Sequence, residues 1–383
     1  MEAADYPGLF AQAHSVLQQC AQPAGLSAAV ASSQSRSYHL IQAGFADILN
    51  NEPIQSEHVF GIGSITKVFL AIVVLQLVEE GKLALSDCID HHLADDVLRD
   101  IDIAPGVTIE QLLGHTAGVD SWEDDPNWIR HGRGDAVQPD HIWSKTEPLD
   151  YIRRPRQSAA PAGHWYYSNT NYTLLGLIVE AATHEPAEAE IRRRILVPLQ
   201  LQHTYLEGFE ERAQHGTLPR RYHLATATFR RTAGICPAFP EIRPDLIEAR
   251  GYNMSTSWLA GGMISSPADL CTFALALRDG KLLMPDSMRF MQQWRHAGDD
   301  RECGHGLFRM KLVDGSGRWI GHSGGVLGFS AGLWWHEERD CVVAVLGNVG
   351  TVHTGGAVGG VKAVLSESDF PAVALKLVGR EDS

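Results

Sequence analysis

Apolar and polar residues alternate in short runs near both ends of the chain. The segments "LSAAVASS" and "SYHLIQAGFAD" predict two antiparallel strands joined by a polar turn. Toward the other end, four further runs predict four more strands with glycine-rich or charged turns between them: "HGLFRMKLV", "GRWIGHSG", "GFSAGLWWHE" and "DCVVAVLGN".

The middle of the chain has the apolar spacing of helices instead. "NYTLLGLIVEAATHE" follows that spacing, and "TIEQLLGHTAG" opens with Thr108 and Gln111 in the arrangement of a capping box. In "SPADLCTFALALRDG", Ser266 is the expected cap, Pro267 takes the first helical position and Gly280 is the expected stop.

Strands at both ends with helices between them predict an α+β fold, an α/β sandwich. Its antiparallel sheet would be built from the N- and C-terminal segments and flanked by helices. We expect residues 1–92 and 256–383 to form this discontinuous sheet domain, and residues 93–255 to form a mostly helical inserted domain. An active site would lie in the cleft between the two. Residues 210–255 are rich in Arg, Pro and Gly and weakly periodic, which predicts long loops, placed where they could cover a pocket.

The net negative charge of the chain argues against some classes of binding partner. The chain of 383 residues carries 32 basic and 46 acidic side chains, a net charge of −14. Such a surface repels phosphate backbones, so neither nucleic acid nor an anionic membrane is an expected partner. The longest apolar run, Val68–Leu75, is far shorter than the roughly 20 residues of a membrane span.

The sequence lacks the patterns of a signal peptide, of a disulfide framework and of a zinc site. The opening Met1–Asp5 is acidic where a signal peptide needs a basic start, which predicts a cytoplasmic protein. The six cysteines include no C-x-x-C pair and the histidines no H-E-x-x-H motif, so we expect neither a disulfide framework nor a zinc site. Cys271 and Cys341 fall in apolar segments and are expected core residues. Nothing in the sequence indicates an oligomeric state.

Ser64 and Lys67 stand at the start of a strongly apolar segment, "FGIGSITKVFLAIVVLQLVEEGKL". Residues three apart share one face of a helix, so the ammonium can reach the hydroxyl. A serine at a helix N-terminus also lies among unpaired N–H groups that favour developing negative charge. A hydroxyl becomes a nucleophile only beside a base, and a lysine with a lowered pKa can be that base. The pair alone leaves two interpretations open: a cap with a surface charge, or a nucleophile with its activator.

Tyr167 and Asn169 precede a second apolar helix, in "HWYYSNTNYTLLGLIVE". Asn169 could be an ordinary N-cap. In the functional interpretation the phenol and the carboxamide project together into a cleft, where nearby cations would ease ionisation of Tyr167 so that it can move protons, and Asn169 would hold a substrate amide.

A third candidate follows a predicted strand in "WIGHSGGVLGFSAGLWW", where His322, Ser323, Gly324 and Gly325 are consecutive. This could be a glycine-rich hairpin with a chance histidine. In the functional interpretation the glycines let the backbone approach a ligand, an N–H of this edge completes an oxyanion hole, and His322 adds a donor or a cation.

Together the three segments resemble the penicillin-binding-protein-like serine hydrolases, which include class C β-lactamases, DD-peptidases, D-aminopeptidases, D-amino-acid amidases and esterases. The family signatures S-x-x-K, Y-x-N and K/H-x-G occur in that order at Ser64–Lys67, Tyr167–Asn169 and His322–Gly324. The phrases "LLGHTAGV", "YSNTNYTLLG", "PLQLQHT" and "AGGMISSPADL" also resemble the family, so the likeness runs from about residue 25 to about 350.

The resemblance implies a β-lactamase/transpeptidase-like fold and acyl transfer without metal or organic cofactor, on a small-molecule or short-peptide substrate. Ser64 would attack a carbonyl, with Lys67 and Tyr167 sharing the proton transfers and Tyr167 protonating the leaving group. Asn169 would bind an acyl-side amide or help fix Lys67. The N–H groups of Ser64 and Gly325 would form the oxyanion hole, each donor contributing ~3 kcal/mol to transition-state stabilisation.

The chain departs from class C β-lactamases at His322, where lysine is usual. His322 would orient Tyr167 or a substrate carboxylate. With an ordinary pKa near ~6.5 it would be only partly charged at pH 7, so we expect it to change the rate between pH 5.5 and 8. Efficient β-lactam hydrolysis is then disfavoured.

The sequence therefore predicts a hydrolase of amides or short peptides, D-stereospecific, acting through a Ser64 acyl-enzyme. An esterase or acyltransferase that tailors a secondary metabolite is the alternative; a strict β-lactamase or DD-carboxypeptidase ranks lower. A non-catalytic binding protein on the same fold has no need of Ser64, Lys67 and Tyr167 together. The pocket walls stay open, because each aromatic candidate could equally be core packing: Trp122, Trp128, Trp143 and Tyr172.

Overall fold

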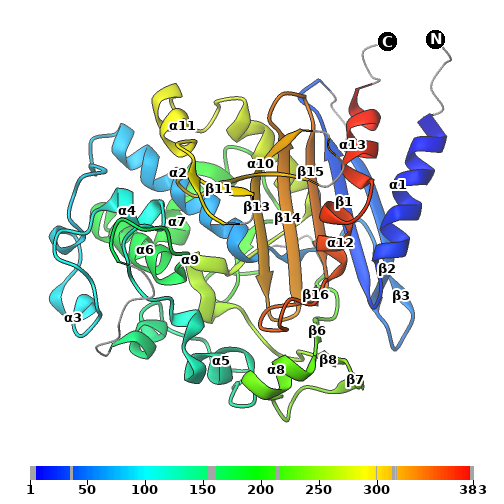
Figure 1. The fold of residues 1–383 in the computed structure, drawn as a ribbon, viewed down its shortest axis with the longest axis horizontal. Helices are drawn as coiled ribbons and strands as arrows, with labels where there is room; N and C mark the ends of the chain where they lie inside the picture. Colours follow the sequence, from blue (N-terminus) through cyan, green and yellow to red (C-terminus); the bar gives the residue numbers. More distant parts are fainter. Residues whose placement is uncertain are drawn as a thin grey trace.

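A large antiparallel sheet forms the centre of the molecule (Figure 1). The structure, a computed structural model, describes residues 6–34, 38–153, 161–212, 216–298, 300–312, 315 and 317–379. In this part of the chain the sheet has nine strands in the order β10-β11-β12-β13-β14-β15-β1-β2-β3. The strands are β1 (Gly25–Ala31), β2 (His39–Asp47), β3 (Glu52–Pro53), β10 (Arg295–His296), β11 (Arg301–Cys303), β12 (Phe308–Lys311), β13 (Arg318–Val326), β14 (Phe329–His336) and β15 (Val342–Gly347).

The predicted strands are confirmed, and so is the predicted joining of the two chain ends in one sheet. Strand β1 lies between β15 and β2 and is buried along its whole length. Its register pairs Leu26 with Gly347 on one side and with Ala43 on the other. A central strand covered on both faces must be apolar at every position, which explains why "GLSAAVA" contains no charged residue.

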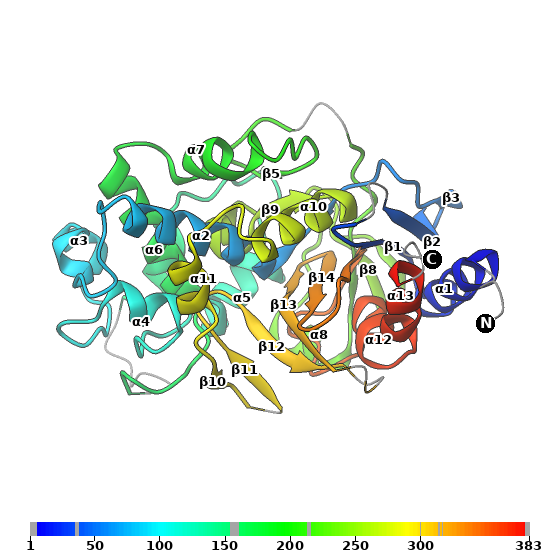
Figure 2. The same ribbon diagram turned by 90° about the horizontal axis from the view of Figure 1, so that it is seen from above.

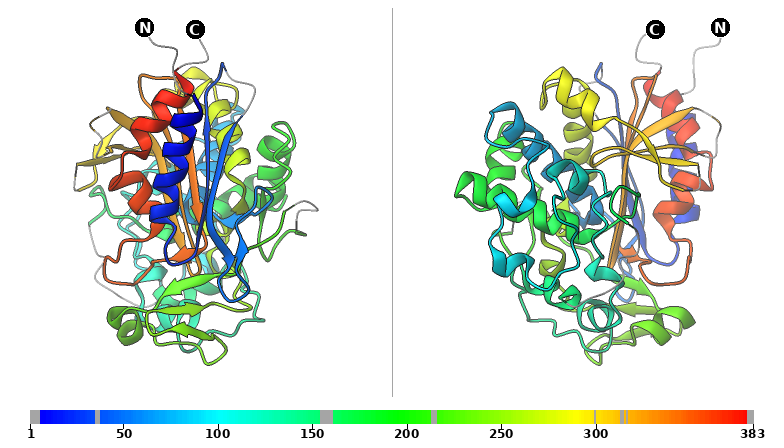
Figure 3. Two further views of the ribbon diagram at one scale, coloured as in Figure 1. Left: turned by 90° about the vertical axis from the view of Figure 1, so that its right-hand side faces the viewer. Right: turned by 60° about the vertical axis from the view of Figure 1, so that its left-hand side comes forward.

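Helices cover both faces of this sheet. Helices α1, α12 and α13 pack side by side against one face, and α10 packs against the other, with α2 behind it (Figures 2 and 3). A hydrophobic core lies on each face of the sheet, and successive residues of β14 point into opposite cores. Leu333 belongs to the larger core, on the α10 side, and Trp334 belongs to the smaller core beneath the terminal helices. The helices are α1 (Tyr6–Cys20), α2 (Thr66–Glu79), α3 (Asp95–Leu98), α4 (Ile109–Leu113), α5 (Pro126–Arg133), α6 (Asn169–Thr183), α7 (Ala187–Ile191), α8 (Ala227–Thr232), α9 (Trp258–Gly261), α10 (Pro267–Arg278), α11 (Pro285–Met291), α12 (Gly360–Ser366) and α13 (Phe370–Val378).

The predicted helix boundaries are largely correct. The Thr108 side chain accepts a hydrogen bond from the Gln111 N–H and Gln111 bonds back, which completes the capping box before α4. Ser266 caps α10, Pro267 starts it, and Gly280 follows its C-cap. None of the helices within the described residues is long and apolar enough to cross a membrane.

The prediction of long loops over residues 210–255 is wrong in part. This segment contributes β6 (Tyr222–Leu224), β7 (Glu241–Arg243), β8 (Leu246–Glu248) and α8, and with β16 (Val349–Gly350) the strands form a small sheet in the order β16-β6-β8-β7. Strands of two or three residues are too short to show periodicity, and the partner β16 comes from more than 100 residues along the chain.

The four aromatic residues considered as pocket walls are core residues instead. Their exposed fractions do not exceed 8%, and all belong to the larger core: Trp122, Trp128, Trp143 and Tyr172. Cys271 and Cys341 are buried and free, as expected. The division into a sheet domain and an inserted helical domain stays a prediction.

Candidate active site

Ser64 lies in a 3-10 turn, Gly63–Ile65, that leads directly into helix α2. Helix α2 is apolar and buried on nearly all sides because it packs against α6, α7 and α9, which fixes the position of the turn at its start. Gly63 has φ +50°, a left-handed conformation that favours glycine. Ser64 itself stays partly exposed and can be reached by a substrate.

Lys67 is fully buried one helical turn after Ser64. Its Nζ lies 3.0 Å from Ser64 Oγ, 2.6 Å from Asn169 Oδ1 and 2.5 Å from the carbonyl oxygen of Ala260 in α9. Burial lowers the pKa of Lys67 to about 7. The negative charge of Glu123 partly opposes this lowering, and the positive charge of Arg133 adds to it. A neutral amine keeps two N–H donors for the two carbonyl oxygens, so its lone pair is left for the hydroxyl of Ser64. Lys67 is therefore placed and tuned as a base.

Tyr167 lies close to Lys67, whose Nζ is 5.0 Å from the centre of the tyrosine ring. Burial raises the pKa of Tyr167 far above that of a free phenol, and the neighbouring Ser64 hydroxyl only partly opposes the rise. The expectation that cations ease ionisation of Tyr167 is therefore wrong, because burial, with a further rise from the charge of Glu123, disfavours the phenolate. Among the described residues its hydroxyl has no hydrogen bond of ordinary geometry, so this protonated phenol is free to donate to a substrate.

Asn169 is the first residue of α6 and its amide is held from two sides. Its Oδ1 accepts from Lys67, and its Nδ2 donates to the carboxylate of Glu123. The carboxylate can only accept, so the Nδ2 of the amide faces Glu123 and its Oδ1 is left to face Lys67. Asn169 makes no side-chain cap, so the N-cap interpretation fails and its contact with Lys67 agrees with the positioning role.

His322 packs against the same group of rings. Its ring centre lies 6.3 Å from that of Tyr167 and 4.9 Å from that of Phe308. Burial, reinforced by the charge of Lys67, lowers the pKa of His322 to about 3, so the ring is neutral near pH 7. Its Nδ1 donates to the carbonyl oxygen of Ser323 at 2.5 Å. The expected partial charge of His322 at pH 7 is therefore wrong, because the sequence could not show how deeply the ring is buried.

Gly324 and Gly63 let strand β13 and the Ser64 turn approach each other closely. A Cβ on Gly324 would lie 1.9 Å from the carbonyl oxygen of Ile62 and 3.1 Å from Ser64 N, and a Cβ on Gly63 would lie 2.5 Å from Gly325 N. The N–H groups of Ser64 and Gly325 are thus neighbours across this contact, as an oxyanion hole requires.

The end of β13 has one free edge. Strand β12 pairs with β13 only as far as Gly321, and over the described residues the segment from His322 to Val326 pairs only with β14. Ser323 is exposed on this segment. An extended substrate can add its main chain to such an edge.

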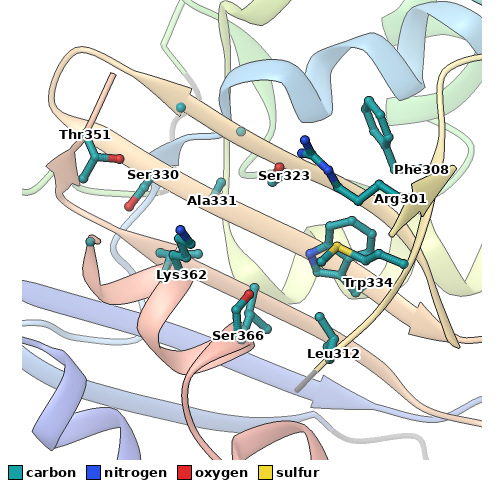
Figure 4. A pocket seen from close by; sticks show the side chains of 16 residues that line it. Arg301, Phe308, Leu312, Ser323, Ser330, Ala331, Trp334, Thr351, Lys362 and Ser366 are labelled. Carbon is teal, nitrogen blue, oxygen red and sulfur yellow. The ribbon is translucent and has the colours of Figure 1, made fainter. Parts of the chain in front are cut away.

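A cavity of about 340 Å³ adjoins this edge on the side of α12 (Figure 4). Its wall includes Ser323 and Gly325 from β13, Trp334 from β14 and Leu365 from α12. The cavity shares Ser323, Gly324 and Gly325 with the candidate site, but neither Ser64 nor Lys67 lines it.

His115 was not among the residues singled out from the sequence. Its ring stacks on that of Tyr167 with centroids 4.4 Å apart, and its Nδ1 accepts from the Ser168 N–H at 3.2 Å. Burial, with Lys67 and other histidines nearby, keeps the pKa of His115 well below the ordinary value. The phrase "LLGHTAGV" contained this residue, but only its contact with Tyr167 shows what it does.

The fold and the Ser64–Lys67–Tyr167 group define a serine hydrolase. A family model described as Beta-lactamase matches residues 15–359, and the chain belongs to this family. Penicillin-binding protein 4* of Bacillus subtilis is 26% identical over 297 residues, which cover 75% of this chain and 60% of that protein. The chain therefore spans only part of its curated relatives: it matches 54% and 60% of the lengths of two Bacillus subtilis proteins.

Two solved structures match over nearly the whole chain. A D-stereospecific amidohydrolase from Streptomyces sp. has a TM-score of 0.72 and 27% identity, covering 88% of this chain and 94% of that one. The D-amino acid amidase of Ochrobactrum anthropi SV3, in complex with L-phenylalanine, has a TM-score of 0.77 and 25% identity, covering 97% and 99%.

Proposed function

We propose that this serine hydrolase cleaves amides or short peptides with D-configured residues through an acyl-enzyme on Ser64. The observation that carries the proposal is the Ser64 hydroxyl 3.0 Å from an amine whose pKa burial lowers to about 7. The likeness to a D-stereospecific amidohydrolase and a D-amino acid amidase supports the amide and the D-configuration.

In the proposed reaction, Ser64 Oγ attacks the carbonyl carbon while its proton passes to the lone pair of Lys67. The N–H groups of Ser64 and Gly325 hold the negative oxygen of the tetrahedral intermediate. The phenol of Tyr167 gives its proton to the leaving nitrogen as the C–N bond breaks, and regains one from Lys67. Water then attacks the ester carbon and gives its proton to Lys67, which passes it to Ser64 Oγ as the bond between Oγ and the acyl carbon breaks, so that the acid and free Ser64 are released.

Labelling tests the acyl-enzyme. The wild type and Ser64→Ala are incubated with a fluorophosphonate or with penicillin, and their intact masses are measured, with Ser330→Ala as a control in the cavity wall. We expect one adduct on the wild type and on Ser330→Ala and none on Ser64→Ala. A wild type that forms no adduct and hydrolyses nothing would contradict the proposal and favour a binding protein.

A substrate panel tests the chemistry and the stereospecificity. D- and L-aminoacyl amides, D-dipeptides and p-nitrophenyl esters are compared by kcat/KM. We expect hydrolysis of the D-amides and little of their L-forms. Activity confined to esters, or equal for both enantiomers, would contradict the proposed substrate class.

A further inference from the structure

A partly buried chain of polar contacts leads away from Lys67. It runs from Asn169 to Glu123, from Glu123 to Arg133 and from Arg133 to His353. Glu123 lies in the 3-10 turn Trp122–Asp124, Arg133 ends α5, and His353 follows β16. The turn and α5, which are neighbours in sequence, thus meet the distant segment after β16 behind the Asn169 side chain of the candidate site.

The Glu123–Arg133 pair is built into its surroundings. Arg133 Nη1 lies 2.5 Å from Glu123 Oε1, and the exposed fractions of the two side chains are 2% and 22%. The guanidinium stacks on the ring of Trp128 at 5.0 Å and donates to Nε2 of His353 at 2.9 Å. Burial lowers the pKa of His353 to about 4, so it accepts this bond as a neutral ring. A buried ion pair with these added contacts is held in one geometry.

The turn that carries Glu123 is tied to the helix that carries Asn169. The backbone N–H of Trp122 donates to Thr170 Oγ1 at 3.2 Å, and Trp122 Nε1 donates to Thr173 Oγ1 at 3.1 Å. These two bonds hold the turn of Glu123 beside the start of α6, where Asn169 lies.

We infer that Glu123 and Arg133 are positioning residues of this active site, which fix the amide of Asn169 and set the charge around Lys67. The inference rests on the proposed role of Ser64. Among the described residues, the groups that face or act on Lys67 are the Ser64 hydroxyl, the Asn169 amide, the Ala260 carbonyl, the rings of Tyr167 and Tyr172, the neutral His115 and His322, and the charges of Glu123 and Arg133.

The two charges act on Lys67 with opposite signs. Glu123 raises the pKa of Lys67 and Arg133 lowers it. Glu123 is itself kept ionised because Arg133, with His353 and Lys67, lowers its pKa against the effect of burial. Removal of one charge should therefore shift the titration of Lys67 in one direction, and removal of the other should shift it in the opposite direction.

The test is the rate at which a neutral fluorophosphonate labels Ser64, measured by intact mass from pH 5 to 9. We expect Glu123→Gln to move the midpoint of the rise down by roughly one pH unit, and Arg133→Met to move it up by a similar amount. The double variant should return close to the wild-type midpoint. For substrates, kcat should fall and KM should stay, because neither side chain is placed to bind the substrate.

Glu190→Gln is the matched control. Glu190 pairs with Arg194 at 2.6 Å, with side chains only 5% and 6% exposed, and its removal should change stability without moving the midpoint. If Arg133→Met does not fold, the isosteric Glu123→Gln decides alone: a lower midpoint supports the inference and an unchanged one overturns it.

Other outcomes separate the inference from the function it rests on. A wild type that is not labelled at Ser64 overturns the proposed function. A labelled wild type whose variants keep its midpoint overturns the role of the pair alone. A rise in KM confined to substrates with a free amine, at an unmoved midpoint, would make Glu123 a binding residue and would also overturn the positioning role.

Discussion

Lys67 Nζ lies 3.0 Å from Ser64 Oγ, while its other two close contacts are carbonyl oxygens that can only accept. A base must be neutral to take the proton, and burial lowers the pKa of Lys67 to about 7. We therefore expect kcat/KM for an amide to fall as the pH drops below about 7 and to level off above it. Tyr167 stays protonated over that range because its pKa is raised.

Lys67→Met should abolish most of the activity and, with it, the fall of kcat/KM below about pH 7. Loss of a general base costs on the order of 10²- to 10⁴-fold in rate. Initial rates between pH 5 and 9 measure the effect, and a thermal melt shows that the variant folds. A wild-type midpoint near pH 10, where an ordinary lysine titrates, would contradict the assignment.

His322 should not shape the pH profile between pH 5 and 9, since its pKa is about 3. We expect His322→Asn to keep the wild-type midpoint even if its rate is lower. His322→Lys would place a second ammonium near Lys67, whose pKa then falls because like charges disfavour each other, and the midpoint moves to lower pH. The two pH profiles are compared with that of the wild type. A midpoint that disappears in His322→Asn would restore the histidine as the titrating group.

His115 supports Tyr167 through two separable contacts, the stacked ring and the acceptor Nδ1. His115→Phe keeps a ring but leaves the buried Ser168 N–H without its acceptor, which should cost about 1–3 kcal/mol of unfolding free energy. His115→Asn offers a short acceptor and tolerates the left-handed φ of +56° at this position, but it removes the stacking. Denaturant melts and kcat measure the two effects. We expect the larger loss of stability in the first variant and the larger loss of kcat in the second.

The residues to which we assign the reaction could be singled out from the sequence, because each stands at the end of a helix or strand that a strong local pattern defines. Ser64 and Lys67 share one helical turn, so their contact follows from spacing alone. The joining of Tyr167 and His322 with this pair required the ordered motifs of the family.

The groups that tune those residues could not be predicted in the same way. The contact of Asn169 with Lys67 was one of the roles implied by the resemblance, but the contacts of Glu123 and Arg133 depend on where a short turn and α5 pack, and no periodicity encodes that placement. The low pKa of His322 comes from burial beside the rings of Tyr167 and Phe308 and from the charge of Lys67, whereas a sequence provides only the ordinary pKa of a histidine. Local pattern thus singled out the candidate reacting groups, and long-range packing determines their protonation.

Gly324 should be essential for the contact between β13 and the Ser64 turn. A Cβ there would lie 1.9 Å from the carbonyl oxygen of Ile62, a distance that no side-chain rotation can relieve because both partners are backbone. Gly324→Ala must therefore move the strand away from the turn and separate the N–H groups of Ser64 and Gly325. Loss of one oxyanion donor typically costs about 10²- to 10³-fold in kcat.

Gly81→Ala is the control for a glycine-to-alanine change as such. Gly81 has φ +68°, and a Cβ added there would meet no atom of the described residues within 4 Å, so alanine costs ~1 kcal/mol of backbone strain without a clash. We expect Gly81→Ala to melt at a lower temperature and keep kcat, and Gly324→Ala to lose kcat even at temperatures where it is fully folded. If Gly324→Ala hydrolyses amides at the wild-type rate, the N–H of Gly325 does not stabilise the transition state.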